Sequence, residues 1–90
     1  MATVNATQER WLHCQLDKGM FSDEVAVTYP AEGPVVRSVF VPKSEVHGEL
    51  GERGFVRVRV LWKPGAMIAI LPSAESDIVA VTEQDVSVNP

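Results

Sequence analysis

The chain has 90 residues, of which 46% are hydrophobic but only 7% aromatic, and its net charge is −4. This length allows one small domain with one core, since roughly 60–65% of the surface of so short a chain is buried on folding. The apolar content argues against disorder, and the negative charge disfavours nucleic acid and anionic lipid because it repels phosphate at long range.

Cysteine usage, the N-terminus and hydropathy all favour the cytoplasm. The single cysteine, Cys14, allows no intramolecular disulfide and no cysteine-based zinc cluster. The first residues lack the basic and apolar regions of a signal peptide, and no stretch approaches the roughly 18 apolar residues of a membrane helix. We therefore expect a cytoplasmic protein without a cofactor.

The N-terminal part of the chain predicts a tail followed by a strand. Residues 1–8 are small and polar and are expected to form a flexible tail to a single domain over residues 9–90. Residues 10–17 alternate between apolar and polar side chains, as a strand does, although the same residues also fit one face of a short helix. We favour the strand, which Gly19 would end.

Two further segments predict a hairpin. Residues 24–29 alternate, with Val25, Val27 and Tyr29 on one face, and the pattern resumes over residues 35–41. In residues 35–41 both faces are mostly apolar. That composition is typical of a strand near the middle of a closed sheet or around a bulge.

The clearest strand signal is residues 55–62, which read FVRVRVLW. The three valines and Trp62 fall on one face, and the arginines fall on the other, which is the period-two pattern of a half-buried strand. The β-branched residues also disfavour a helix. Gly54 and the turn over residues 63–65 flank the segment, and we expect it to be the central strand.

The remaining elements are shorter. Residues 42–54 form the longest connection, in which residues 44–46 favour a single helical turn. Residues 67–71 are wholly apolar and are expected to be the most buried strand. Residues 78–81 and 86–88 predict two more short strands.

An eight-residue pattern occurs twice. Residues 39–46 (VFVPKSEV) and 79–86 (VAVTEQDV) share three identities and the order aliphatic, any, aliphatic, breaker, two polar residues, acid, valine. We interpret them as one supersecondary device used twice, in which a strand runs into a polar turn that returns a valine to the core.

Five to six short strands with polar turns and no long helix predict an all-β fold, a small antiparallel barrel. The pattern resembles an SH3-like or related small barrel, in architecture alone. Such barrels carry many unrelated functions, so the fold by itself does not indicate a function.

Basic residues gather around the central strand. Arg57 and Arg59 share one of its faces, and a paired strand carrying Arg37 would bring three guanidinium groups together near Phe55. Arginines beside an aromatic ring suit single-stranded nucleic acid or an acidic peptide. They also fit an ordinary solvated strand face, and the net charge favours that alternative.

Large apolar side chains exceed what a narrow barrel can enclose. The surplus residues are Trp11, Met20, Phe21, Leu50, Trp62 and Met67. They predict either a hydrophobic patch for a partner or plugs that close the ends of the barrel. This surplus is the strongest functional indication in the sequence.

Catalytic and metal-binding arrangements have little support. His13 and Cys14 are adjacent and would point to opposite faces of a strand, so the imidazole cannot activate the thiol. His13 and His47 lack metal-ligand spacing, and the acidic loops lack the order of a calcium motif. We expect no catalytic or metal site.

The sequence thus predicts a small non-catalytic binding module whose partner is another protein or a second copy of the chain. The alternative is a nucleic-acid-binding barrel that uses its arginines. The candidate interaction residues are Trp11, Met20, Phe21, Trp62, Arg37, Arg57 and Arg59.

Overall fold

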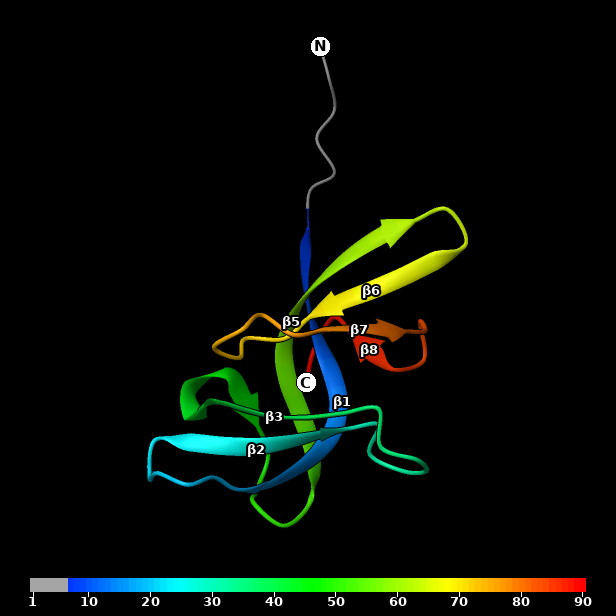
Figure 1. Ribbon diagram of the computed structural model, residues 1–90. Coiled ribbons are helices and arrows are strands. Elements are labelled where there is room, and N and C mark those ends of the chain that lie inside the picture. The colour runs from blue at the N-terminus through cyan, green and yellow to red at the C-terminus, as the bar shows by residue number, and fades with distance from the viewer. Residues whose placement is uncertain (1–6) are drawn as a thin grey trace.

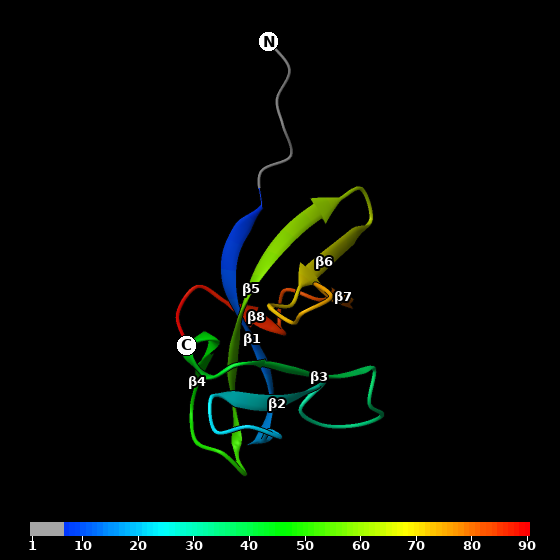
Figure 2. The same cartoon turned by 60° about the vertical axis from the view of Figure 1, so that its left-hand side comes forward.

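The computed structural model describes residues 7–90 and has a nearly closed antiparallel barrel of six strands (Figures 1 and 2). The elements are β1 (Gln8–Lys18), β2 (Glu24–Tyr29), β3 (Arg37–Pro42), a 3₁₀ turn η1 (Lys43–Glu45), β4 (Val46–His47), β5 (Arg53–Lys63), β6 (Ala66–Ile70), β7 (Ile78–Val81) and β8 (Val86–Ser87). The strand order is β3-β2-β1-β5-β6-β7, with β4 paired to β5 and β8 paired to β1. The predicted all-β barrel is confirmed.

The helix content and the N-terminal residues were also considered in the sequence. Within residues 7–90, no helix is long and apolar enough to cross a membrane. The tail expected over residues 1–8 lies mostly on residues 1–6, which are outside the described residues. β1 begins at Gln8, which lies opposite Val60 of β5.

β1 and β5 form the antiparallel ribbon around which the other strands are arranged. Alternate side chains of both strands point into the barrel, and Val56, Val58 and Val60 are buried as predicted. The strand interpretation of residues 10–17 is therefore correct. Trp62 belongs to the same face of β5 but is 44% exposed, because β5 continues beyond the residues that pair with β1.

β3 is not a middle strand, which corrects the expectation drawn from its two apolar faces. Among the described strands it pairs only with β2, and it forms one end of the strand order. Val35 and Val36 precede the strand and are exposed. The outer apolar residues of this segment therefore face solvent instead of a further layer.

β6 is not the most buried strand, although its sequence is wholly apolar. Met67, Ala69 and Leu71 are buried, whereas Ile68 and Ile70 lie half-buried on the outer face. The strand has one core face, like β2. Met67 was expected among the surplus apolar side chains, and it lies in the core instead.

The two halves of the chain have the same arrangement. In the first half, β1, β2 and β3 are followed by η1 and by β4, which pairs with β5. In the second half, β5, β6 and β7 are followed by a turn and by β8, which pairs with β1. Leu12 and Val56 lie opposite each other, and they also lie opposite Val86 and Val46, respectively. The halves are thus related by an approximate twofold rotation about the centre of the β1–β5 ribbon.

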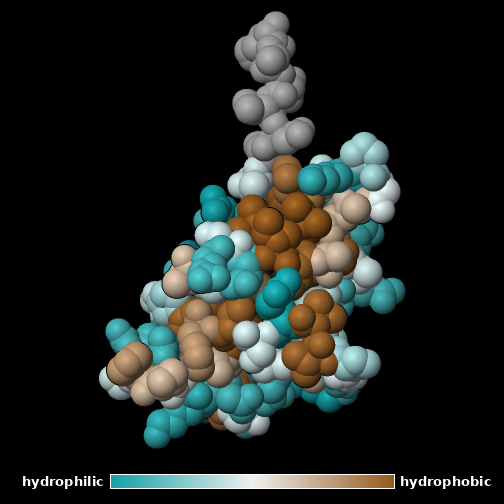
Figure 3. Space-filling model, viewed as in Figure 1, coloured by the Kyte–Doolittle hydropathy of each residue, from teal (hydrophilic) through white to brown (hydrophobic). Residues whose placement is uncertain are grey.

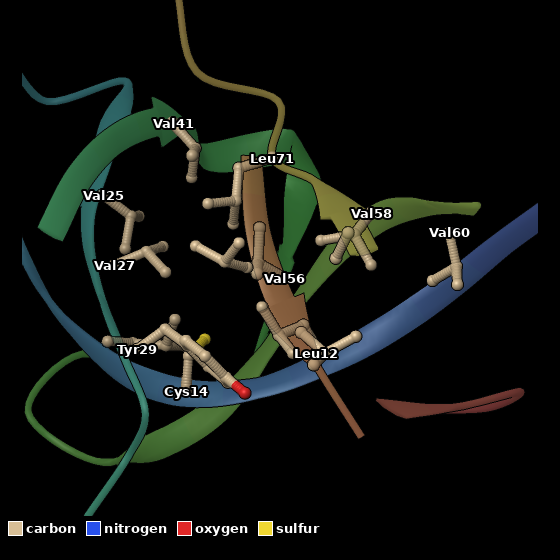
Figure 4. Close-up of a cluster of buried hydrophobic side chains, with 14 of the residues drawn as sticks. Leu12, Cys14, Val25, Val27, Tyr29, Val41, Val56, Val58, Val60 and Leu71 are labelled. Carbon is tan, nitrogen blue, oxygen red and sulfur yellow. The ribbon is translucent and has the colours of Figure 1, made fainter. Parts of the chain in front are cut away.

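The strand pairings relate the core residues by the same symmetry, and Figure 4 shows part of this core. When the strand pairings of the halves are matched, each core residue of one half corresponds to a core residue of the other. The matched pairs are Leu12/Val56, Cys14/Val58, Leu16/Val60, Val25/Met67, Val27/Ala69, Tyr29/Leu71, Val39/Val79, Val41/Val81 and Val46/Val86. The structure confirms that both returning valines pack against the core. The correspondence between the halves therefore extends beyond the eight-residue pattern, to residues 8–47 and 53–87.

Candidate interaction surface

The structure separates Arg37 from the other two candidate arginines. Arg57 and Arg59 lie on the outer face of β5, whereas Arg37 begins β3. Strands β2 and β1 lie between β3 and β5 in the sheet. The expected face of three arginines is therefore not formed. Arg37 instead donates a hydrogen bond from its guanidinium to the carbonyl oxygen of Ile78 at 3.4 Å.

Trp11 is held within the protein's own surface. It lies opposite Arg57, whose guanidinium is 5.2 Å from the centroid of the indole ring, a cation–π arrangement. The ring of His47 packs edge-on against the same indole, with 6.2 Å between centroids. Because Arg57 of β5 and His47 of β4 pack against its ring, Trp11 is half-buried and is not free to anchor a partner.

The other predicted apolar residues do not form one patch. Met20 and Phe21 follow β1 and are 73% and 67% exposed, and Trp62 lies near the end of β5 with Arg10 over its ring. Since β1 and β5 are antiparallel, these residues lie at opposite ends of the ribbon (Figures 1 and 2). Figure 3 likewise shows separate hydrophobic areas divided by hydrophilic residues.

The barrel is open between β3 and β7, the two ends of the strand order, and we call this opening the seam. In the part of the chain that the structure describes, no strand pairing joins β3 to β7. Side chains bridge the seam: the Arg37 guanidinium reaches the carbonyl oxygen of Ile78, and the Tyr29 hydroxyl reaches that of Ala80 at 3.5 Å. Both contacts are long for hydrogen bonds, and the single proton of the Tyr29 hydroxyl is donated to Asp85, 2.8 Å away.

Large apolar side chains are exposed along the seam. Phe40 on β3 is 45% exposed, and Ile78 on β7 is 51% exposed. Val35 and Val36, just before β3, are more exposed still. These four residues were not among the candidates from the sequence. Their side chains flank a sheet edge, which makes the seam the strongest candidate interaction surface.

Two grooves meet at Phe40. One has a volume of about 300 Å³ and is lined by Asp23, Glu24, residues 40–42 and residues 72–74. The other has a volume of about 200 Å³ and is lined by Val39, Phe40, Ser73, Ala74, Glu75 and Asp77. Both are lined by Phe40, Ser73 and Ala74, so they adjoin each other between β3 and the β6–β7 loop, and we call the two together the seam groove.

A hydrogen-bond network fixes Tyr29 beside the seam. Its hydroxyl donates to Oδ2 of Asp85 at 2.8 Å, and the backbone N–H and the hydroxyl of Thr82 donate to the same oxygen at 2.9 Å. Burial opposes ionisation of Asp85, but these hydrogen bonds hold the pKa of its carboxyl below the ordinary value. Burial and the Asp85 carboxylate together raise the pKa of Tyr29, so at neutral pH a neutral phenol faces a carboxylate.

We expect Tyr29→Phe to lower the free energy of unfolding by about 1 kcal/mol at pH 7, since the carboxylate keeps both donors from Thr82. A lowered carboxyl pKa adds stability above the ordinary value of 3.8 and loses it as the pH falls through the folded-state pKa. Urea unfolding of the unaltered protein and of Tyr29→Phe, at neutral and at strongly acid pH, measures the free energy of unfolding of each. The difference between the two proteins should be smaller in acid. A difference that does not change with pH would show that the hydroxyl acts through packing alone.

The residues considered for catalysis are kept apart. Cys14 is in the core, where burial raises the pKa of its thiol to about 12, so the thiol stays protonated. His13 is on the outer face of β1 and packs against the ring of Phe55, with 5.4 Å between centroids. Within residues 7–90, no group of three or more histidine, cysteine, aspartate or glutamate side chains is placed to hold a metal ion.

Comparisons with known proteins place the chain in no family: no family model matches it, and no curated protein or solved structure is significantly similar.

Proposed function

We propose that this protein is a non-catalytic module that binds an extended segment of another protein at the seam. The supporting observation is that, among the described strands, a sheet edge without a strand partner coincides with exposed apolar side chains, Phe40 and Ile78. An edge of this kind readily accepts a further strand. An added strand from a partner pairs with the backbone while its side chains occupy neighbouring pockets.

The backbone of β7 supports this mode of binding. The carbonyl groups of Ile78 and Ala80 both face away from β6, since the carbonyl of the preceding residue, Asp77, accepts a bond from Leu71 on the β6 side, and Arg37 of β3 reaches the carbonyl of Ile78. Alternate residues of a strand direct their backbone groups to the same edge. β7 therefore offers two residues to a partner strand. The bond from Arg37 is long and comes from an exposed side chain, so a partner's backbone can replace it.

Three further expectations from the sequence remain proposals. The partner is a different protein, and a second copy of the chain, paired edge to edge, is the competing occupant. A cytoplasmic location is supported by the single cysteine, which is buried. An SH3-like character of the barrel is supported by its short strands and polar turns alone.

The alternative function is binding of single-stranded nucleic acid on the outer face of β1 and β5. Its support is Arg57, whose Nε is buried without a hydrogen-bond partner among the described residues, and the neighbouring Arg59. Against it, Arg57 already covers Trp11, and the hollow beside the two arginines also contains Glu9 and Glu45. The net charge of −4 opposes phosphate as well.

Random linear peptides displayed on phage and selected on the full-length protein test the proposal. We expect Phe40→Ser with Ile78→Ser to weaken the selected peptides by about tenfold or more, because both apolar contacts are lost. The matched control is Leu50→Ser with Trp62→Ser, which removes two similarly exposed apolar side chains away from the seam. Binding that survives the seam substitutions and is lost in the control would overturn the proposal.

Two further measurements separate the competing partners. The first is the mass of the protein in solution over a range of concentrations. If the mass doubles as the concentration rises, and Phe40→Ser with Ile78→Ser abolishes the doubling, the protein binds a second copy of itself at the seam. That result would contradict the proposal that the partner is a different protein. Binding of a single-stranded oligonucleotide that falls steeply with salt and is lost in Arg57→Glu would establish the alternative function.

A further inference from the structure

We infer that the segment bound in the seam groove carries basic side chains on both sides of an apolar one. This inference rests on the proposed function and adds the chemistry of the partner. It follows from the order of charges and apolar side chains along the groove.

Acidic side chains line both ends of the seam groove. Asp23 and Glu24 line only the larger hollow, at one end. Glu75 and Asp77 line only the smaller hollow, at the other end. No lysine or arginine lines either part. In residues 7–90, the one ion pair within 4.0 Å joins Arg53 to Glu32, so these four carboxylates have no basic partner there.

The middle of the groove is mostly apolar. Phe40 and Ala74 belong to both parts together with Ser73, whose hydroxyl is bonded to Asp77, and Val41, Pro42 and Pro72 extend the apolar lining toward the first pair of acids. A partner side chain that enters beside Phe40 therefore meets mostly carbon. In an extended segment the side chains two residues away on either side share its face, and these meet the carboxylates. Burial of the apolar side chain supplies most of the affinity, and the charges at the ends set selectivity and the rate of association.

Two of the four carboxylates are held in place by local hydrogen bonds. Oδ2 of Asp77 accepts a bond from the hydroxyl of Ser73 at 2.6 Å, and Oε1 of Glu24 accepts one from the backbone N–H of Met20 at 3.1 Å. In each case the second carboxylate oxygen is left for a partner. Fixed carboxylates bind a lysine or arginine at a smaller loss of side-chain entropy than mobile ones.

A bound cation is a poorer explanation for these acids. The two pairs lie in opposite parts of the groove, and among the described residues no three acidic, histidine or cysteine side chains are grouped as metal ligands. A segment with separated positive charges matches two separated acidic pairs. The net charge of −4 attracts the same segment at longer range.

Three synthetic peptides of seven residues test the inference on the full-length protein. All have phenylalanine at position 4 and threonine at the four odd positions, and positions 2 and 6, which share a face with the phenylalanine in an extended chain, are both lysine, both serine or both glutamate. We expect the lysine peptide to bind about tenfold more tightly than the serine peptide, with an advantage that shrinks as salt increases. We expect no measurable binding of the glutamate peptide.

Charge reversal identifies the acids involved. Asp23→Lys with Glu75→Lys changes two exposed side chains at opposite ends of the groove, and it should remove the advantage of the lysine peptide. Glu49→Lys with Glu83→Lys changes the net charge equally at two exposed positions outside the groove and should leave the advantage intact.

The outcomes separate this inference from the proposed function. Equal affinity of the lysine and serine peptides, with both weakened by Phe40→Ser and Ile78→Ser, would refute the basic segment and leave the proposed function standing. A lysine advantage that persists in Asp23→Lys with Glu75→Lys would also refute it. If none of the three peptides bound, the result would count against both the basic segment and the proposed function.

Discussion

Val58→Asp is expected to unfold the protein. Val58 is 2% exposed on the inward face of β5, at the centre of the core. A carboxylate there has no basic partner, and burying an unpaired charge costs several kcal/mol. That loss is comparable to the whole stability of a small domain, about 5 kcal/mol at the lower end of the usual range. Circular dichroism and a thermal melt of the purified variant measure the effect.

Arg59→Asp is the matched control, because it introduces the same carboxylate at the next residue of the same strand. Arg59 is exposed on the outer face and lies opposite Glu9, so we expect a loss of at most about 1 kcal/mol from like-charge repulsion. A folded, cooperatively melting Val58→Asp protein beside an unfolded Arg59→Asp protein would show that the two faces of β5 are reversed.

Leu12→Ala is expected to lower the free energy of unfolding by about 3–4 kcal/mol, through lost burial and the cavity left behind. Leu12 is fully buried in the centre of the β1–β5 ribbon, opposite both Val56 and Val86. Few atoms there can move to fill the space, because strands pair with β1 on both sides. Urea unfolding at constant pH gives the difference from the unaltered protein.

Leu50→Ala makes the same chemical change on a leucine that is 46% exposed in the loop before β5. We expect it to change the free energy of unfolding by less than about 0.5 kcal/mol. If the two substitutions were equally costly, Leu12 would not be part of a packed centre.

Strands were predictable from the sequence because alternation is a local property. The pattern around Val56 to Trp62 identified β5, and the weaker pattern around Leu12 identified β1 over a competing helix. Strand neighbours are not local. Nothing within residues 35–41 distinguishes a middle strand from an edge strand with exposed apolar side chains, so β3 was placed wrongly.

The internal repeat was visible in only one stretch for a related reason. Core positions constrain apolar character and approximate volume more than residue identity. Cys14 therefore corresponds to Val58, and Tyr29 to Leu71, without any resemblance at the level of letters. The similarity between residues 39–46 and 79–86 is visible in the sequence because both valine-rich strands lead into turns of the same length.

The sequence predicted some of the exposed apolar side chains, such as Met20 and Phe21, but not those along the seam. A surplus of apolar side chains was expected, and exposed apolar side chains are present. Phe40 and Ile78 come together only because β3 and β7 are the two ends of one strand order. Trp11, in contrast, is covered by Arg57 of the paired strand, a contact that depends on register.

The most direct test of seam binding is a ¹H–¹⁵N spectrum of the full-length protein titrated with a phage-selected peptide. Binding at the seam predicts that the largest shifts occur at Phe40, Ala74, Ile78 and Ala80, with little change around Arg57. Shifts concentrated around Arg57 and its neighbours on the outer face of β5, with the seam unchanged, would contradict it.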